Sequence, residues 1–164
     1  MPAVEASLDR FRAAHTQVLG VSVDSVHCHA NWAKDLGGIS FPLLADFNPK
    51  GALAQSLGLY LEKAGITDRA TVIIDSGGTV SHASSVTPAG RRDIAALAAL
   101  CEEIDKASST PREPFAPPPG VPEGATLYIK SQCGFSRATL LAMENLHLTG
   151  KVPVRNITDD PAAK

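Results

Sequence analysis

The pattern of apolar positions predicts that helices and strands alternate over residues 1–106. Val4, Leu8 and Phe11 fall at helical spacing, with charged residues between them. Similar spacing, ended in two cases by glycine, predicts helices over residues 28–36, 51–57 and 91–106. Apolar and β-branched runs predict strands over residues 17–23, 41–46, 70–75 and 79–85, the last two joined by a turn at 76–78. The pattern is typical of an α/β layered sheet with one β-hairpin.

A proline-rich stretch at residues 107–124 is the clearest change of composition along the chain. Such a stretch cannot sustain a helix and favours an extended, semi-rigid spacer. Beyond it, the pattern predicts a strand over residues 125–130, a helix over 134–146 and a strand over 152–157. A βαβ unit of about 40 residues is too small to hold a core alone. We therefore predict a first domain at 1–106, a linker at 107–124 and an incomplete second domain at 125–164.

Charge and hydropathy exclude several classes of partner. The formal net charge is −2 over 164 residues, which gives no reason to expect a nucleic acid or an anionic membrane as partner. The first residues carry charge where a signal peptide needs an apolar stretch, and no apolar run approaches the ~20 residues that cross a bilayer. We therefore expect a cytoplasmic protein.

The three cysteines, Cys28, Cys101 and Cys133, favour thiol chemistry without a disulfide framework. An odd number of widely spaced cysteines, in a chain with no signal peptide, argues for reduced thiols. No pair has the spacing of a zinc site or a dithiol centre. Cys101 falls at the apolar spacing of a helix, so we expect it in the core, together with Phe11 and Trp32.

Cys133 is the clearest candidate for a reactive group. It follows an apolar strand pattern and precedes a helix pattern, with Lys130 and Arg137 nearby. The unpaired N–H groups and positive dipole end of a helix N-terminus stabilise a thiolate, the reactive form of cysteine. The alternative is a helix-start cysteine with no substrate site around it.

Cys28 is a second candidate, because it lies at the start of a predicted helix between His27 and His29. Adjacent residues rarely converge on one metal ion, so the pattern favours an ordinary, partly exposed thiol over a metal site. We predict no metal ligands in this chain.

Four stretches of the first block resemble peroxiredoxins of the alkyl hydroperoxide reductase and thiol-specific antioxidant family. They are Leu-Gly-Val-Ser-Val-Asp-Ser at 19–25, Ala-Asn-Trp at 30–32, Phe-Pro-Leu-Leu-Ala-Asp at 41–46 and Arg-Ala-Thr-Val-Ile-Ile-Asp at 69–75. The resemblance implies a thioredoxin-like fold and thiol-dependent reduction of hydroperoxides with no bound cofactor. It also implies a hydroperoxide and a thiol reductant as partners, and a homodimer is one expected assembly.

The resemblance assigns a role to Arg69, whose counterpart in the family points at the peroxidatic thiolate. A fixed guanidinium favours the thiolate and stabilises charge that develops on the peroxide oxygen. The alternative is that Arg69 pairs with a carboxylate such as Asp46. Cys28 lies where some members carry a resolving cysteine, which attacks the sulfenic acid of the peroxidatic residue.

The sequence departs from that family at the nucleophile. The Thr-x-x-Cys segment that carries the peroxidatic cysteine does not occur, and the opening Met-Pro-Ala resembles the stretch just after it. A truncated product, a misplaced start and a degenerate copy each explain this departure. We therefore expect peroxidase activity to be impaired or absent.

The second block resembles the first half of a monothiol glutaredoxin, through Cys-Gly-Phe-Ser at 133–136, Leu-Tyr-Ile-Lys at 127–130 and Asp-Asp-Pro at 159–161. Later glutathione-binding segments of that family are absent. The resemblance implies that Cys133 attacks a glutathione mixed disulfide, with Lys130 meeting the glutathione carboxylate and Phe135 lining the same site. It alternatively implies that Cys133 ligates a 2Fe–2S cluster shared between two subunits.

Three hypotheses follow for function. The leading one is a fragment of a peroxiredoxin–glutaredoxin fusion, in which glutathione supplies reducing equivalents through the second domain to the first. Tethering the two domains makes that step intramolecular. The alternatives are a non-catalytic binding module of redoxin fold and a glutathione- or iron–sulfur-binding protein built on Cys133.

Overall fold

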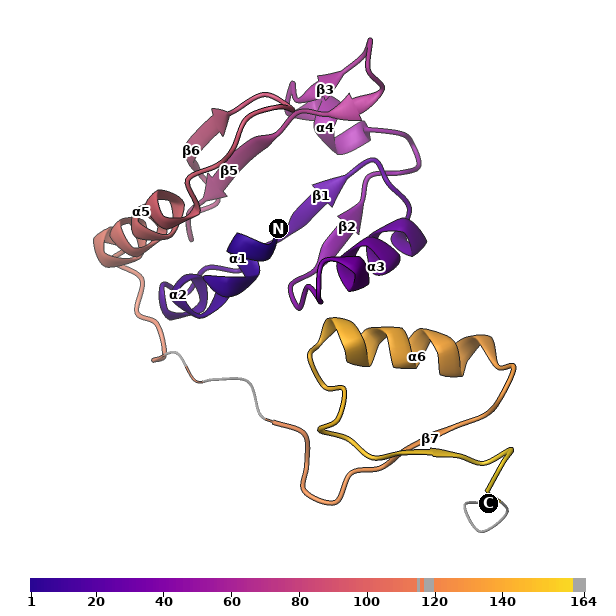
Figure 1. Cartoon of the computed structure of the whole chain (residues 1–164). Coiled ribbons are helices and arrows are strands. Elements are labelled where there is room, and N and C mark those ends of the chain that lie inside the picture. Colours follow the sequence, from indigo (N-terminus) through magenta and orange to yellow (C-terminus); the bar gives the residue numbers. More distant parts are fainter. Residues whose placement is uncertain (115, 117–119, 161–164) are drawn as a thin grey trace. The chain divides into compact units, whose positions relative to one another are not determined.

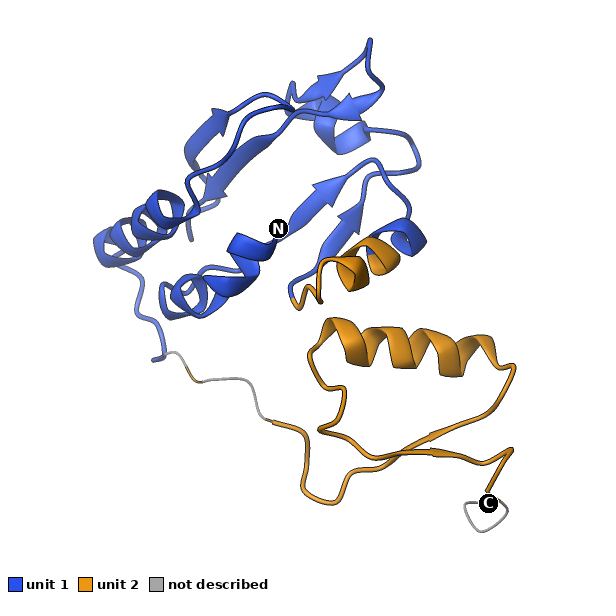
Figure 2. Ribbon diagram, in the orientation of Figure 1, with its two compact units in different colours: residues 1–29, 41–115 blue, residues 30–40, 116–164 orange. Residues whose placement is uncertain are grey.

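We describe the chain from a computed structural model that covers residues 1–114, 116 and 120–160 (Figure 1). It divides into two compact units, coloured separately in Figure 2. Unit 1 comprises Met1–His29 and Phe41–Phe115, and unit 2 comprises Ala30–Ser40 and Ala116–Lys164. The predicted domain boundaries stay predictions.

The strands of unit 1 form three separate pairs. The parallel pair consists of β1 (Gly20–Ser22) and β2 (Leu43–Ala45). One antiparallel pair consists of β5 (Ala70–Ile74) and β6 (Val80–Ser85), joined by the expected hairpin. The other, which the apolar pattern did not predict, consists of β3 (Tyr60–Leu61) and β4 (Ile66–Thr67). Within the described residues each strand has one hydrogen-bonded neighbour, so these pairs do not join into a wider sheet.

Helices supply the core of unit 1. They are α1 (Pro2–Ala6), α2 (Leu8–Ala13), α4 (Ala52–Ser56) and α5 (Ile94–Ala107). Helices α2 and α5 pack together around Phe11, Ala14, Ala98 and Cys101, and Ile73 of β5 packs against this cluster. The core positions predicted for Phe11 and Cys101 are therefore confirmed.

Helices α4 and α2 end in the same backbone motif, with different residues at its left-handed position. At the end of α4, Gly58 takes φ +68° and the Leu59 N–H bonds to the Ala54 carbonyl at 2.7 Å. At the end of α2, His15 takes φ +48° and the Thr16 N–H bonds to the Phe11 carbonyl at 2.9 Å. Both are Schellman-type ends, which glycine usually supplies because a side chain strains this conformation. The structure therefore holds a histidine at a position where the backbone favours glycine.

Unit 2 contains the βαβ element that the sequence predicts. It consists of β7 (Leu127–Ile129), α6 (Gly134–Asn145) and β8 (Val154–Asn156), with β7 and β8 parallel. The helix α3 (Val26–Asp35) begins in unit 1 and continues in unit 2.

Helix α6 is held to the unit 2 part of α3. Lys34 pairs with Glu144 at 2.9 Å, and the Asn145 amide donates to the Ala30 carbonyl at 3.2 Å. A Cβ on Gly38 would lie 2.6 Å from His147 Cε1, so this close approach requires glycine. The predicted core position of Trp32 is wrong, because its side chain lies on α3 with 42% of its surface exposed.

The helices of the described residues are all too short or too polar to cross a membrane.

Candidate thiol sites

Cys133 occupies the N-cap position of α6, directly after the loop that leaves β7. Its backbone is extended, with φ −104° and ψ +121°, and its carbonyl accepts the Arg137 N–H at 3.0 Å. The side chain makes no capping hydrogen bond, and the thiol is free and partly exposed. The thiol therefore lies beside N–H groups of the first turn that α6 itself leaves unpaired.

These surroundings lower the pKa of the Cys133 thiol below its ordinary value of 9.0. The largest cause is the Ser136 backbone N–H, followed by the Ser136 hydroxyl; the Phe135 N–H and the Lys130 charge act in the same direction. Partial burial opposes them. The site stabilises a thiolate mainly through hydrogen bonds at the helix N-terminus.

Ser136 joins this helix end to the preceding strand. Its hydroxyl oxygen accepts the Lys130 backbone N–H at 3.0 Å, and the same hydroxyl helps to lower the pKa of the Cys133 thiol. The sequence identified Ser136 only as the residue that replaces a second cysteine. Its role in holding the thiolate depends on the turn geometry, which the apolar pattern does not report.

The loop before Cys133 is braced by the end of β8. The Ser131 N–H donates to the Thr158 hydroxyl at 3.0 Å, and the Asn156 amide donates to the Ser131 hydroxyl at 2.8 Å. Gln132 takes a left-handed φ of +56°. These bonds fix the loop although it is largely exposed, so the position of the thiol is set by both strands of the βαβ element.

Three of the predicted site residues, Lys130, Cys133 and Phe135, are brought together at this end of α6. Phe135 has 89% of its surface exposed, and Lys130 is also exposed. A partly exposed thiol, an exposed cation and an exposed apolar ring thus follow one another along the chain at the start of α6.

Cys28 lies in the first turn of α3 with an exposed thiol. Its N–H donates to the Ser25 hydroxyl at 3.2 Å, and its sulfur lies 4.0 Å from Asp24 Oδ1. The Asp24 carboxylate also accepts the Ser22 hydroxyl at 2.7 Å. The Cys28 sulfur therefore faces a carboxylate, whereas the Cys133 thiol lies at a helix N-terminus.

Arg69 precedes β5, and its side chain is exposed. Within the described residues its guanidinium forms no ion pair. Asp46, the alternative partner, caps α4 instead, with its two oxygens accepting the Leu53 N–H at 3.0 Å and the Ala54 N–H at 2.9 Å. Pairing with Asp46 is therefore wrong, and Arg69 remains available as a cation.

Arg92, which the sequence did not single out, reinforces the positive charge beside Arg69. Its guanidinium donates to the Ala70 carbonyl at 2.8 Å. Burial lowers the pKa of Arg92, with the Arg69 charge as the next cause in that direction. Two guanidinium groups thus act on one another at the start of β5.

Cys101 is chemically distinct from the other two thiols. It is 3% exposed in the core of unit 1, and burial raises the pKa of its thiol.

Cys28 and Arg69 belong to unit 1 and share no contact within the described residues, whereas Cys133 belongs to unit 2. The described part of the chain holds no group of three His, Cys, Asp or Glu side chains placed to bind a metal ion.

Known proteins match mainly the first part of the chain. The profile of the AhpC/TSA family matches residues 1–83. Alkyl hydroperoxide reductase E of Mycobacterium tuberculosis is 38% identical over 86 residues, which is 52% of this chain and 56% of that protein. Peroxiredoxin-4 of Bos taurus is 37% identical over 91 residues, which is 51% of this chain and 32% of that protein.

Solved structures agree with this match. Mycobacterium tuberculosis AhpC superposes with a TM-score of 0.57 at 27% identity, over 62% of this chain and 61% of that chain. The reduced 2-Cys peroxiredoxin of Plasmodium vivax superposes with a TM-score of 0.56 at 27% identity, over 63% of this chain and 55% of that chain. The predicted thioredoxin-like fold is confirmed, and the chain spans just over half the length of its mycobacterial relatives.

The family match covers residues 1–83, and the resemblance of residues 125–164 to glutaredoxins stays a prediction. The family profile covers half of the chain, and the relatives and solved structures that it matches are peroxiredoxins. The chain belongs to the AhpC/TSA family.

Proposed function

We propose that this chain takes part in glutathione-linked reduction of hydroperoxides, with Cys133 as a thiol-exchange centre that serves the peroxiredoxin unit. The observation that carries the proposal is the position of the Cys133 thiol at the N-terminus of α6, where Ser136 lowers its pKa. A thiolate near neutral pH is what nucleophilic attack on a disulfide requires.

The proposed exchange proceeds in two steps. The Cys133 thiolate attacks the glutathione sulfur of a protein–glutathione mixed disulfide, so that a new S–S bond forms at Cys133 and the protein sulfur leaves as a thiolate. A second glutathione thiolate then attacks the glutathione sulfur on Cys133, which releases glutathione disulfide and restores the Cys133 thiolate. The protein sulfur has gained the electrons that glutathione has lost.

Unit 1 fits the step before this exchange. A peroxiredoxin thiolate attacks one peroxide oxygen, which gives a sulfenic acid and an alcohol or water, and glutathione converts the sulfenic acid to the mixed disulfide with loss of water. The unpaired guanidinium of Arg69 supports a role in stabilising charge on the peroxide oxygen. Because the sequence has no Thr-x-x-Cys segment, we propose that this chain alone reduces hydroperoxides weakly or not at all.

Lys130 and Phe135 are proposed to bind glutathione beside Cys133. A lysine ammonium suits a carboxylate, and the exposed Phe135 ring offers an apolar surface. A 2Fe–2S cluster takes four ligands, but unit 2 offers one thiolate and no converging donors among its described residues. The alternative of a cluster therefore needs ligands from a second subunit and from glutathione, and it stays a prediction. A homodimer and a cytoplasmic location remain predictions.

The test is reduction of a glutathionylated model protein by the purified full chain, followed through consumption of NADPH by glutathione and glutathione reductase. We expect turnover that Cys133→Ser abolishes and that the matched control Cys28→Ser retains. Consumption of hydrogen peroxide in the same coupled system should be weak. The proposal fails if the folded chain gives no turnover, or if Cys133→Ser keeps it; the first outcome would favour a non-catalytic binding module.

A further inference from the structure

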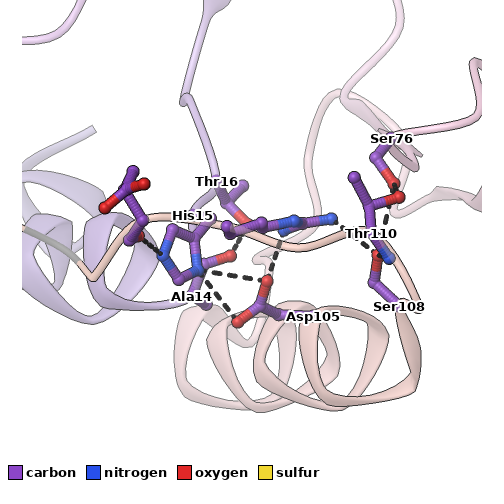
Figure 3. A network of polar contacts seen from close by, with 9 residues as sticks. Ala14, His15, Thr16, Ser76, Asp105, Ser108 and Thr110 are labelled. Atoms are coloured by element: carbon purple, nitrogen blue, oxygen red, sulfur yellow. Dashed lines mark hydrogen bonds and ion pairs between the residues drawn. The ribbon is translucent and has the colours of Figure 1, made fainter.

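A network of polar contacts attaches the first residues of the linker to unit 1 (Figure 3). His15 Nδ1 lies 3.1 Å from Asp105 Oδ2, and His15 Nε2 lies 2.8 Å from the Glu113 carbonyl oxygen. Arg112 also pairs with Asp105 and donates to the Ser108 hydroxyl at 3.1 Å. The network therefore joins the end of α2, the last turn of α5 and the chain beyond it.

The contacts of His15 identify its protonation state. Both ring nitrogens face groups that only accept hydrogen bonds, a carboxylate and a backbone carbonyl. A neutral imidazole carries one N–H, so it can satisfy only one of these contacts. The imidazolium carries two and satisfies both. Geometry alone therefore assigns the charged form of His15 to this arrangement.

The network is partly shielded from solvent. The side chains of His15, Asp105 and Arg112 are 29%, 19% and 22% exposed. Ser76, in the turn between β5 and β6, lies 3.4 Å from the Ser108 hydroxyl and 3.5 Å from that of Thr110. Figure 3 shows these hydroxyl groups at the other end of the same network from His15. Residues 108–113 are thus held from α2, α5 and the hairpin turn.

The charged groups around His15 belong to three elements. On α5 these are Asp105 and Glu102, on α2 they are Arg10, Arg12 and Asp9, and on the linker they are Arg112 and Glu113. Arg10 pairs with Glu102 at 2.8 Å and Arg12 with Asp9 at 3.2 Å, so these four charges are matched among themselves. Asp105 and Arg112 are left as the charges that act directly on His15.

We propose that His15, Asp105 and Arg112 form a pH-sensitive clasp that holds the linker at Glu113 on unit 1 when His15 is protonated and releases Glu113 when His15 is neutral. The contacts raise the pKa of His15 above its ordinary value of 6.5, with the Asp105 hydrogen bond as the largest cause and the Glu113 carbonyl as the next. A raised pKa means that the clasp is complete below the ordinary value and is lost as pH rises through the raised one.

The clasp sets the point at which the linker leaves unit 1. Closed, it attaches the chain as far as Glu113. Open, it leaves the chain attached only as far as Arg112, which pairs with Asp105 whatever the charge of His15. The length of chain between two tethered units determines the effective concentration of one for the other. A change of pH in the range where histidine titrates would thus alter the tether without any change at a thiol.

The test is an NMR titration of the full chain, which follows the His15 ring and the heteronuclear NOE of the Glu113 backbone amide, with the Ser108 amide as an internal reference. We expect His15 to titrate above 6.5. We expect a rigid Glu113 amide at about pH 5.5 and a loss of its NOE at about pH 8.5, on either side of the histidine range, while the Ser108 amide stays rigid. His15→Gln should keep the Glu113 NOE low at both values, whereas His82→Gln should keep the pH dependence of the native chain.

Two further variants test the proposal even if the His15→Gln variant does not fold. Asp105→Asn should lower the His15 pKa, because it removes the largest favourable contact, and Arg112→Gln should raise it, because the Arg112 charge opposes protonation. The proposal is overturned if His15 in the native chain titrates at or below its ordinary value. It is also overturned if the Glu113 amide keeps the same NOE at both pH values, or if the two variants shift the pKa in the same direction.

Discussion

The hydroxyl of Ser136 accepts the Lys130 N–H at 3.0 Å, just after β7, and the same hydroxyl lowers the pKa of the Cys133 thiol. One side chain thereby couples the loop conformation to the charge state of the reactive group. A hydrogen bond to a charged group is stronger than one between neutral groups, so the arrangement favours the thiolate.

Ser136→Ala should slow the alkylation of Cys133 by iodoacetamide several-fold near neutral pH. The variant removes the hydroxyl that helps to lower the pKa of Cys133, so a smaller fraction of the thiol is ionised. Peptide mapping by mass spectrometry measures the rate at Cys133. Thr139→Ala, which removes a hydroxyl bonded only to the Phe135 carbonyl, serves as the control and should react at the native rate.

The pH profile of the same reaction gives a second prediction. Because the pKa of Cys133 is lowered from 9.0, its reactivity should persist below the pH at which an ordinary thiol loses it. The reactivity should then fall as the pH drops through the lowered pKa. A profile for Cys133 that coincides with that of an unstructured cysteine peptide would contradict this account of the site.

The two cysteines of unit 1 should differ in their effect on stability. Cys101→Ala leaves a small cavity in the α2–α5 core and should cost about 1–2 kcal/mol. Cys28→Ala removes an exposed thiol and should change the free energy of unfolding by less than about 0.5 kcal/mol. Urea denaturation followed by circular dichroism measures both. Equal effects of the two substitutions would argue against the burial of Cys101.

Asp46→Ala should destabilise unit 1 by about 1–2 kcal/mol, because its carboxylate caps the first turn of α4 through two backbone N–H groups. Asp35→Ala, at an exposed position on α3, is the control and should have little effect. The same urea titrations measure the difference. No loss of stability in Asp46→Ala would contradict the capping role.

The chain should melt below about 65 °C, the upper end of ordinary mesophile domains. Within the described residues every strand has a single partner, and isolated two-stranded pairs are marginally stable in water. Calorimetry on the full chain measures the transition. A cooperative transition well above this temperature would show that helix packing compensates for the unpaired strand edges.

The sequence predicts an element best where a residue such as glycine marks its end. Helix α3 ends at Asp35 before Gly37 and Gly38, as the glycines indicate. Helix α2 ends with His15 in the left-handed position, which no residue preference announces. The apolar pattern did not predict the β3–β4 pair, because two-residue strands are too short to show alternation of apolar and polar positions. Several observed strands are shorter than the predicted ones, and within the described residues each strand pairs along one edge only.

Sequence alone determined that Cys133 stands between a strand and a helix, since the apolar pattern places both elements, and family motifs such as the stretch from Arg69 to Asp75 indicated the AhpC/TSA family. Only the tertiary structure decided that Asp46 caps α4 and leaves Arg69 unpaired, and that His15 meets Asp105 across 90 positions of the chain. The physical reason is that a periodic pattern reports which face of an element is buried. The partner of a polar side chain depends on which elements folding brings within hydrogen-bond distance.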